Sequence, residues 1–374
     1  MIEFEAVHKR FPNGTTAVHD LTLDMPEGQI TVLVGSSGCG KTTTLRMVNR
    51  MVDQTSGTIR LAGKDILEAD AAVLRRGIGY VIQQSGLFPH RTILDNVATV
   101  PLLLGWGRKK ARARAAELLE TVGLDAATGK RYPNQLSGGQ QQRVGVARAL
   151  AADPPVLLMD EPFGAVDPVV RTQLQDELLR LQKDLNKTIV FVTHDIDEAV
   201  RLGDRIAVFR TGGHLVQCAE PAELLARPAD EFVADFLGAE RGLKLLSLST
   251  LASVPQSTPA ALRADQRISA ATGREDRWQL VTSAEGKPLG WLDTQAAPAS
   301  GTAGDAPLLP VRALRDSDSL LSALNESLSS PGGLVARVDS NGTLTGVTTR
   351  GDIHDHAGGA HTSAGAAAHT GTAV

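Results

Sequence analysis

The stretch GSSGCGKT, residues 35–42, decides the fold of this chain. The continuous apolar run ITVLVG (30–35) leads into it, and the helical pattern TTLRMVNRM (43–51) follows it. A strand, a glycine-rich turn and a helix form the context that confirms the pattern G-x-x-x-x-G-K-[ST]. Backbone N–H groups in such a turn, together with the start of the helix, attract phosphates. The stretch therefore predicts a phosphate-binding loop.

Two side chains of this loop have distinct expected roles. Lys41 is expected to reach the β- and γ-phosphates of a nucleotide as a catalytic cation, and the Thr42 hydroxyl is expected to ligate Mg²⁺. Cys39 stands at a variable position of the pattern, and we expect no chemistry from its thiol. The residues expected to surround the nucleotide here are Gly35, Ser36, Ser37, Gly38, Cys39, Gly40, Lys41, Thr42 and Thr43.

A second apolar run, LLMDEP (157–162), ends in two carboxylates. Strand apposition should place Asp160 beside the Mg²⁺ of the nucleotide. Glu161, one residue further on, is then placed to polarise an attacking water molecule. The alternative is a strand that ends in a solvated acidic turn, and the phosphate loop upstream argues against it.

The composition is that of an ordinary globular chain, long enough for two or three domains. The chain has 374 residues, of which 42% are hydrophobic, and a formal net charge of −4, so no basic surface indicates nucleic acid as a partner. Its two cysteines favour a reducing compartment. We find no signal-peptide pattern and no apolar run approaching the ~18 residues of a membrane helix. Any membrane-spanning part is expected to come from other subunits.

Residues 1–238 alternate between strand and helix patterns, which predicts an α/β fold. Buried strands are expected at 30–35, 156–160 and 188–194, with helices at 112–124 and 169–185. The stretch LSGGQQQRV (136–144) raises a question, because it opens a second helix with another glycine turn. The Ser137 hydroxyl and the free N–H groups there form a second anion site, although the first loop already holds phosphate.

The order of these motifs resembles that of the ATPases of ABC transporters, whose signature is LSGGQ between a phosphate loop and LLMDEP. The resemblance covers residues 1–238 and implies a P-loop NTPase core with an α-helical subdomain at about 88–148. It implies ATP hydrolysis with Mg²⁺. Phe11 resembles the aromatic residue that stacks on adenine, and Gln83 resembles the glutamine that touches Mg²⁺ and the membrane subunit. His194 resembles the switch histidine that contacts the γ-phosphate.

The same resemblance answers the question raised by LSGGQQQRV. In this family two chains pack head to tail, and each ATP lies between the phosphate loop of one chain and the LSGGQ of the other. The implied partner is a second copy of this chain in a C2 homodimer, with Asp167 in the loop that crosses the interface. That loop reads GAVD here and more often SALD, so Gly164 and Val166 are variants. The residues expected to contact the neighbour's ATP are Ser137, Gly138, Gly139 and Gln140.

Residues 167–209 and 220–238 resemble more particularly the ATPases of osmoprotectant importers, which take up glycine betaine, proline, carnitine or choline. This implies two membrane permease subunits, an extracytoplasmic substrate-binding protein and a peripheral location at the cytoplasmic face of the cell membrane. One alternative is an importer ATPase for another solute, such as methionine, a polyamine or another amino acid. Another is a soluble ABC ATPase without a permease, against which the single set of motifs and the short helical insert argue.

The composition changes after about residue 240, and order returns in two related stretches, 277–293 and 332–352. Each has a strand, a glycine turn and a second strand, and their glycines line up 56 residues apart. Residues 239–356 therefore resemble a degenerate tandem CBS module, a small α+β regulatory region. The low-complexity end, 357–374, is expected to be disordered.

One copy of this module matches a ligand-binding element. Thr349-Arg350-Gly351-Asp352 fits the T-x-x-D sequence with which CBS units hold a nucleotide ribose, whereas Asp293 replaces the threonine in the first copy. We therefore expect at most one nucleotide site. A structural appendage without a ligand is the alternative.

Overall fold

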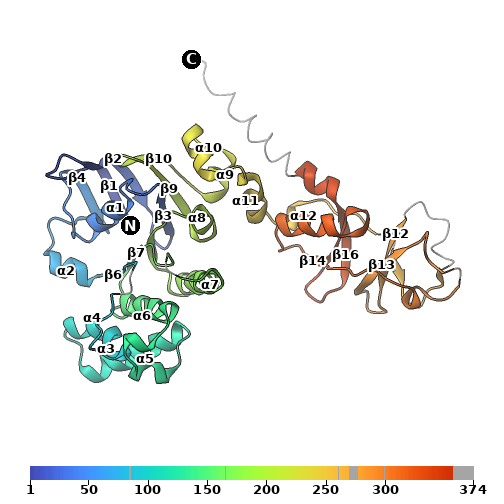
Figure 1. The fold of residues 1–374 in the computed structure, drawn as a ribbon, viewed down its shortest axis with the longest axis horizontal. Coiled ribbons are helices and arrows are strands. Elements are labelled where there is room, and N and C mark those ends of the chain that lie inside the picture. Colours follow the sequence, from blue (N-terminus) through green and yellow to red (C-terminus); the bar gives the residue numbers. More distant parts are fainter. Residues whose placement is uncertain (84–85, 165, 260, 269–276, 299, 357–374) are drawn as a thin grey trace, which may run out of the picture. The chain divides into compact units, whose positions relative to one another are not determined.

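The computed structural model of the chain describes all residues except 84–85, 165, 260, 269–276, 299 and 357–374. The chain divides into two compact units, Met1–Gly238 and Ala239–Val374 (Figure 1). The low-complexity end that is expected to be disordered lies outside the described residues.

A six-stranded sheet forms the centre of the first unit. Its strand order is β10 (His214–Ala219), β9 (Arg205–Arg210), β3 (Ile30–Gly35), β8 (Thr188–Val192), β7 (Val156–Asp160) and β6 (Ile78–Val81). The strands pair in parallel except β10, which is antiparallel to β9. Strands β3, β7 and β8 are buried along their whole length, as continuous apolar runs predict. Strand β8 ends at Val192, two residues before the expected end, because its pairing with β7 stops at Asp160, the last residue of that strand.

A second sheet of the first unit is antiparallel. Its order is β2 (Thr16–Met25), β1 (Ile2–Arg10), β4 (Ser56–Leu61) and β5 (Lys64–Asp65). Strands β1 and β2 pair from Ile2 with Met25 to Arg10 with Thr16. The turn between these two strands therefore presents Phe11.

Helix α1 (Lys41–Val48) joins the two sheets through a shared apolar core. Leu45, Met47 and Val48 are fully buried. They belong to one cluster with Phe4 of β1 and Phe209 of β9. Lys41, the first residue of α1, directly follows the loop after β3, so packing of this helix against both sheets fixes where the loop ends.

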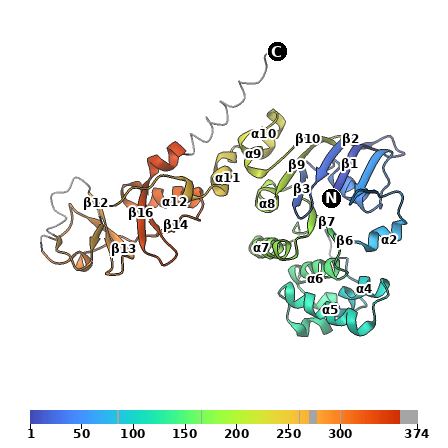
Figure 2. The same ribbon diagram turned by 180° about the vertical axis from the view of Figure 1, so that it is seen from behind.

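The remaining helices of the first unit include one separate group. The short ones are α2 (Ala71–Arg76), α3 (Ile93–Val97), α4 (Thr99–Leu103), α8 (Ile196–Leu202), α9 (Pro221–Ala226) and α10 (Glu231–Leu237), with 3₁₀ turns at Ala126–Lys130 and Pro133–Gln135. The long ones are α5 (Arg108–Thr121), α6 (Gly138–Leu150) and α7 (Pro168–Leu185). Helices α3 to α6 gather at the end of the unit away from α9 and α10 (Figures 1 and 2). Helix α6 also contacts β6 and α7, so it links this helical group to the sheet.

The second unit contains one three-stranded arrangement twice. Its strands are β11 (Ala261–Arg263), β12 (Trp278–Thr282) and β13 (Pro288–Asp293), then β14 (Leu314–Arg315), β15 (Leu334–Val338) and β16 (Leu344–Thr349). In each copy the first strand is parallel to the second, which forms an antiparallel hairpin with the third. The second hairpin begins 56 residues after the first, at Leu334 and at Trp278, as the glycine spacing predicts.

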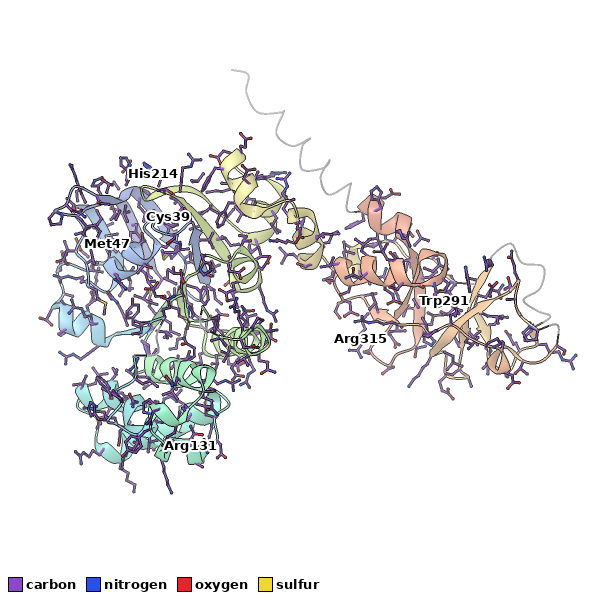
Figure 3. All side chains as sticks on the ribbon, viewed as in Figure 1. Cys39, Met47, Arg131, His214, Trp291 and Arg315 are labelled. Carbon is purple, nitrogen blue, oxygen red and sulfur yellow. The ribbon has the colours of Figure 1, made fainter. Side chains whose placement is uncertain are left out.

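An apolar cluster joins the two hairpins of the second unit. Leu280 and Trp291 pack with Ala336 and Val347, and Trp291 is labelled among the strands in Figure 3. Both hairpins also line a cavity of about 380 Å³. The helical segments whose bounds lie within the described residues of this unit are α11 (Arg241–Leu248), α12 (Leu320–Ser329), 3₁₀ turns at Leu251–Ser253, Ala303–Asp305 and Pro331–Gly333, and residues 350–356.

Thr349 and Asp352 of the expected ribose-binding element bond to each other. The Thr349 hydroxyl donates to Asp352 Oδ2 at 2.7 Å, and the Thr349 N–H donates to the same oxygen at 2.9 Å. In the first copy, the corresponding Asp293 accepts a hydrogen bond from Arg277 Nη2 at 2.8 Å. The two copies therefore share a backbone arrangement but differ in chemistry.

Replacing the buried Arg337 by alanine tests the packing of the second unit. Its side chain is 2% exposed, binds Asp316 at 2.6 Å and donates to the carbonyl of Val254 at 2.8 Å. Because Arg337→Ala leaves that carbonyl without its donor, we expect the free energy of unfolding to fall by about 3 kcal/mol, measured by urea unfolding. The control, Arg263→Ala, removes an exposed ion pair with Asp265 and should change stability by less than ~0.5 kcal/mol. Equal losses would contradict the packing role.

Candidate functional site

The glycines of the stretch 35–42 stand where the loop has no room for side chains. Gly40 has a φ of 101°, and a Cβ on it would lie 2.1 Å from the carbonyl oxygen of Ala17 on β2. A Cβ on Gly35 would lie 2.3 Å from the carbonyl oxygen of Phe209 on β9. Only glycine meets both the positive φ of Gly40 and the close approach of these strands. The glycine pattern therefore has a backbone cause.

Lys41 is buried inside the loop, with an exposed fraction of 5%. Its Nζ donates to the carbonyl oxygens of Gly35 at 2.7 Å and Ser36 at 3.0 Å. Cys39, labelled in Figure 3, is also buried, and its Sγ lies 3.6 Å from the same Nζ. An ammonium group forms charge-assisted hydrogen bonds, which suits it to an anionic ligand such as a phosphate.

Thr42 and Asp160 meet where α1 begins and β7 ends. The Thr42 hydroxyl donates to Asp160 Oδ1 at 2.9 Å, and Arg46 Nη2 lies 3.8 Å from Asp160 Oδ2. Burial raises the pKa of Asp160 above its ordinary value, and the bond from Thr42 and the charge of Arg46 oppose that rise. The parallel pairing of β7 with β8, and of β8 with β3, brings this carboxylate to the loop.

Glu161 is the meeting point of three distant segments. Its Oε2 accepts a hydrogen bond from Gln83 Nε2 at 3.3 Å and lies 3.4 Å from His194 Nδ1. The backbone of Glu161 has a φ of 44°, in the left-handed region that residues with side chains rarely adopt. Such strain persists where the surroundings impose it, and it is frequent at active sites.

Phe11 and Asp167 lie on surface segments. Phe11 is half-buried in the turn after β1, with Lys9 Nζ at 5.2 Å from its ring centroid. Asp167 is exposed immediately before α7, and its carbonyl accepts the N–H of Arg171. A ligand or a second chain can therefore reach both side chains.

The turn at Ser137 opens α6 with a capping box. Ser137 Oγ accepts the N–H of Gln140 at 3.3 Å, and Gln140 Oε1 accepts the N–H of Ser137 at 3.0 Å. Gly138 is exposed, and a Cβ on it would meet nothing within 4 Å. This exposed turn bonds within itself and belongs to the helical group. The predicted residues that gather around the first loop are Lys41, Thr42, Gln83, Asp160, Glu161 and His194.

Sequence patterns did not indicate two contacts of the loop. Arg46 faces Asp160 from α1. Helical periodicity could have predicted this, because Arg46 lies four residues after Thr42 and therefore on the same side of the helix. The Thr211 hydroxyl lies 3.3 Å from that of Ser36 and ties the loop to the β9–β10 turn. No local pattern marks Thr211, because the contact depends on the pairing of β9 with β3.

The donor set of the loop fits a nucleotide with Mg²⁺. The cradle that glycines leave open offers N–H groups and the Lys41 ammonium to phosphates. The Thr42 hydroxyl and the Asp160 carboxylate offer the hard oxygen ligands that Mg²⁺ prefers. Mg²⁺ in such sites keeps several waters and uses few protein ligands. Within the described ranges, no group of three His, Cys, Asp or Glu side chains could hold a metal ion.

Comparisons with known proteins place this chain in one class, the P-loop ATPases of ABC transporters. Residues 18–164 match the family model described as ABC transporter. The osmoprotectant import ATP-binding protein OsmV of Salmonella typhimurium is 46% identical over 368 residues, which cover 95% of this chain and 96% of that protein. The glycine betaine/carnitine/choline transport ATP-binding protein OpuCA of Bacillus subtilis is 42% identical over 364 residues, which also cover 95% and 96%.

A solved structure agrees with these matches. A dimeric ATP-binding cassette in a post-hydrolysis state, bound to ADP and Pi, is 34% identical and has a TM-score of 0.54; the similarity covers 59% of this chain and 99% of that chain. The chain therefore belongs to the ABC transporter family, as an ATP-binding subunit that hydrolyses ATP. The predictions of an α/β P-loop fold, of ATP binding and of ATPase activity are confirmed.

We expect Gly40→Ala to weaken ATP binding at least about tenfold, because the new Cβ would push the loop away from Ala17. Gly38→Ala is the matched control: its φ of 77° is also positive, but a Cβ there meets nothing within 4 Å. Both variants share a backbone strain of about 1–2 kcal/mol, so the difference between them isolates the collision. Equilibrium dialysis with labelled ATP measures it. Equal affinities in the two variants would show that the collision has no effect.

Proposed function

We propose that this chain is the ATP-hydrolysing subunit of an importer for osmoprotectants of the glycine betaine, carnitine, choline or proline type. The observation that carries the proposal is the 46% identity to OsmV over nearly the whole length of both chains, the second unit included. Relatives named for choline and glycine betaine uptake add support. An ATPase does not itself contact the solute, so the proposed solute class rests on kinship with these relatives and not on a solute site in this chain.

The working unit in this proposal is a head-to-tail homodimer. Each ATP lies between the phosphate loop of one chain and the turn at Ser137 of the other. The exposed, internally bonded turn at Ser137 supports this arrangement, and so does the similarity to a dimeric cassette. A C2 interface uses every patch twice, so two equivalent sites result. The residues that contribute from the second chain are Ser137, Gly138, Gly139, Gln140 and Asp167.

Glu161 is the general base in this proposal. Its carboxylate accepts the proton of the attacking water, and Gln83 and His194 hold its Oε2 from two sides. Lys41 stabilises the negative charge on the phosphates. Mg²⁺, when bound, neutralises part of that charge. The residues that hold the metal are Thr42, Gln83 and Asp160, and Phe11 stacks on adenine.

Two permease subunits are the proposed membrane partners, with an extracytoplasmic binding protein that delivers solute to them. Over the described part of the chain, no helix has the length and apolarity needed to cross a membrane. Large apolar side chains are exposed on and near the helical group, at Phe88 (40%), Leu103 (64%) and Leu104 (42%). An exposed apolar patch commonly marks a protein interface. We propose that these three side chains form such a patch and bind the permease at the cytoplasmic face of the cell membrane.

The second unit is, in this proposal, a tandem CBS-like regulatory module. Its duplicated topology and the cavity between its hairpins support that interpretation. Thr349 lines the cavity, and its bonds with Asp352 are also consistent with a structural role without a ligand.

Mixing two inactive variants tests whether the site is shared. Ser137→Arg blocks the neighbour's site, and Glu161→Gln blocks the chain's own site, but both should bind ATP. A mixed dimer has one site with both residues intact, so an equal mixture should recover about a quarter of the wild-type ATPase rate. Each variant alone should show almost none. A mixture as inactive as its components would contradict the shared site.

Solute-stimulated ATP hydrolysis tests the transport assignment. The complex with its permease and binding protein, reconstituted in liposomes, should hydrolyse ATP faster with glycine betaine, carnitine or choline than with methionine or spermidine. A Glu161→Gln complex controls for contaminating ATPases. Stimulation by methionine or spermidine instead would replace the proposed solute class with one of the alternatives.

A further inference from the structure

A buried polar network lies behind His194, and none of the proposed catalytic steps uses it. Glu198 on α8 accepts a hydrogen bond from the Thr193 hydroxyl at 2.7 Å and another from Gln175 Nε2 on α7 at 3.2 Å. The exposed fractions are 6% for Glu198, 2% for Thr193 and 5% for Gln175. Because Thr193 directly precedes His194, this network holds the backbone that presents the histidine to Glu161.

Arg171 connects this network to the loop that ends at Asp167. Its Nη2 donates to the carbonyl oxygen of Val166 in that loop at 3.3 Å. On its other side, Nη1 lies 3.6 Å from Asp195 Oδ2, and Nε lies 3.9 Å from Glu198 Oε1. One guanidinium therefore contacts the proposed dimer-crossing loop and two of the carboxylates at the start of α8, those of Asp195 and Glu198.

The contact between Arg171 and Glu198 is loose. A separation of 3.9 Å is too long for a hydrogen bond, and Arg171 Nε is buried without a hydrogen-bond partner. Burial is also the main cause that raises the pKa of Glu198, which indicates that its negative charge is incompletely compensated. A small movement of the guanidinium toward Glu198 would satisfy both groups, so this pair can adopt a tighter arrangement.

We propose that Arg171 is a positioning residue that couples Val166 and Asp167 to His194. When a second chain contacts Asp167, the neighbouring Val166 shifts, and the guanidinium that binds the Val166 carbonyl closes on Glu198. This tighter contact strengthens the network in which Glu198 already binds Thr193, and so it stabilises the position of His194 beside Glu161. The inference rests on the proposed head-to-tail dimer and adds the path by which the arrival of the second chain reaches the catalytic carboxylate.

The chemistry of arginine suits this role. Its planar guanidinium offers five N–H donors in fixed directions, so one edge can hold a carbonyl while another faces two carboxylates. Lysine keeps the charge but concentrates its donors at one point. Arg171→Lys should therefore retain the attraction to Glu198 and lose the simultaneous contact with Val166.

The same two helices provide a matched control. Arg201 on α8 binds Asp176 on α7 through an ion pair of 2.6 Å. This pair joins α7 to α8, as the Arg171 contacts do, and both of its side chains are exposed at the surface. Arg201→Ala therefore tests whether a lost helix–helix contact is enough to change catalysis.

The experiment compares full-length Arg171→Ala, Arg171→Lys and Arg201→Ala chains. We expect Arg171→Ala to lower kcat for ATP hydrolysis by about 10- to 100-fold, with KM for ATP within about twofold of wild type, because the catalytic groups are misplaced and not removed. Arg171→Lys should lie between that variant and wild type, and Arg201→Ala should hydrolyse ATP at the wild-type rate. Combining Arg171→Ala with Glu198→Gln should lower kcat no further than the larger single effect, since both act through one network.

Two further readouts separate positioning from folding. In a Glu161→Gln background, Arg171→Ala should still form the ATP-bound dimer, measured by size-exclusion chromatography with ATP, and Tm should stay near that of Arg201→Ala. A wild-type kcat for Arg171→Ala would overturn the proposal, and so would equal losses in Arg171→Ala and Arg201→Ala. If Arg171→Ala does not fold, a wild-type kcat for Arg171→Lys would overturn it. Hydrolysis by Glu161→Gln alone would instead refute the proposed site, whatever Arg171 does.

Discussion

The parallel pairing of β3 with β8, and of β8 with β7, is the constraint on which the rest of the structure depends. Parallel neighbours end at the same edge of a sheet, so Gly35, Asp160 and Val192 are followed by segments that meet there. The loop, the two carboxylates and His194 lie far apart in sequence, and only this pairing collects them. A shift of β7 by one residue would turn Asp160 to the other face and separate it from Thr42.

The site is built from charges that the fold keeps out of water and partly compensates. The Lys41 ammonium donates hydrogen bonds to carbonyl oxygens. Asp160 accepts a hydrogen bond from the Thr42 hydroxyl and lies 3.8 Å from the Arg46 guanidinium. Buried charges that are only partly compensated favour a ligand that brings the opposite charge close to them. In our proposal, the exposed turn at Ser137 on the helical group completes the ATP site of the neighbouring chain. ATP hydrolysis therefore requires two chains. The loose pair of Arg171 and Glu198 would couple dimer formation to the position of His194 beside the catalytic carboxylate of Glu161.

The second unit shows how one backbone arrangement can be kept while its chemistry changes. The hairpins repeat after 56 residues. Asp293 nevertheless binds Arg277, whereas Thr349 at the equivalent place binds Asp352. The spacing of glycines predicts the turns of both hairpins, since Gly286 and Gly342 have φ values of 78° and 81°. Which side chains pair across the strands could not be read from that spacing.

The sequence by itself determined the elements whose cause is local. The apolar runs of β3 and β7, the glycine loop before Lys41 and the start of α6 at Ser137 all follow from periodicity and turn chemistry within a few residues. Only the tertiary structure decided where β8 ends, that Thr211 contacts Ser36, and that Arg171 lies between Val166 and Glu198. Those contacts join residues from different elements, and sheet order and helix packing set their distances. A local pattern carries no information about either.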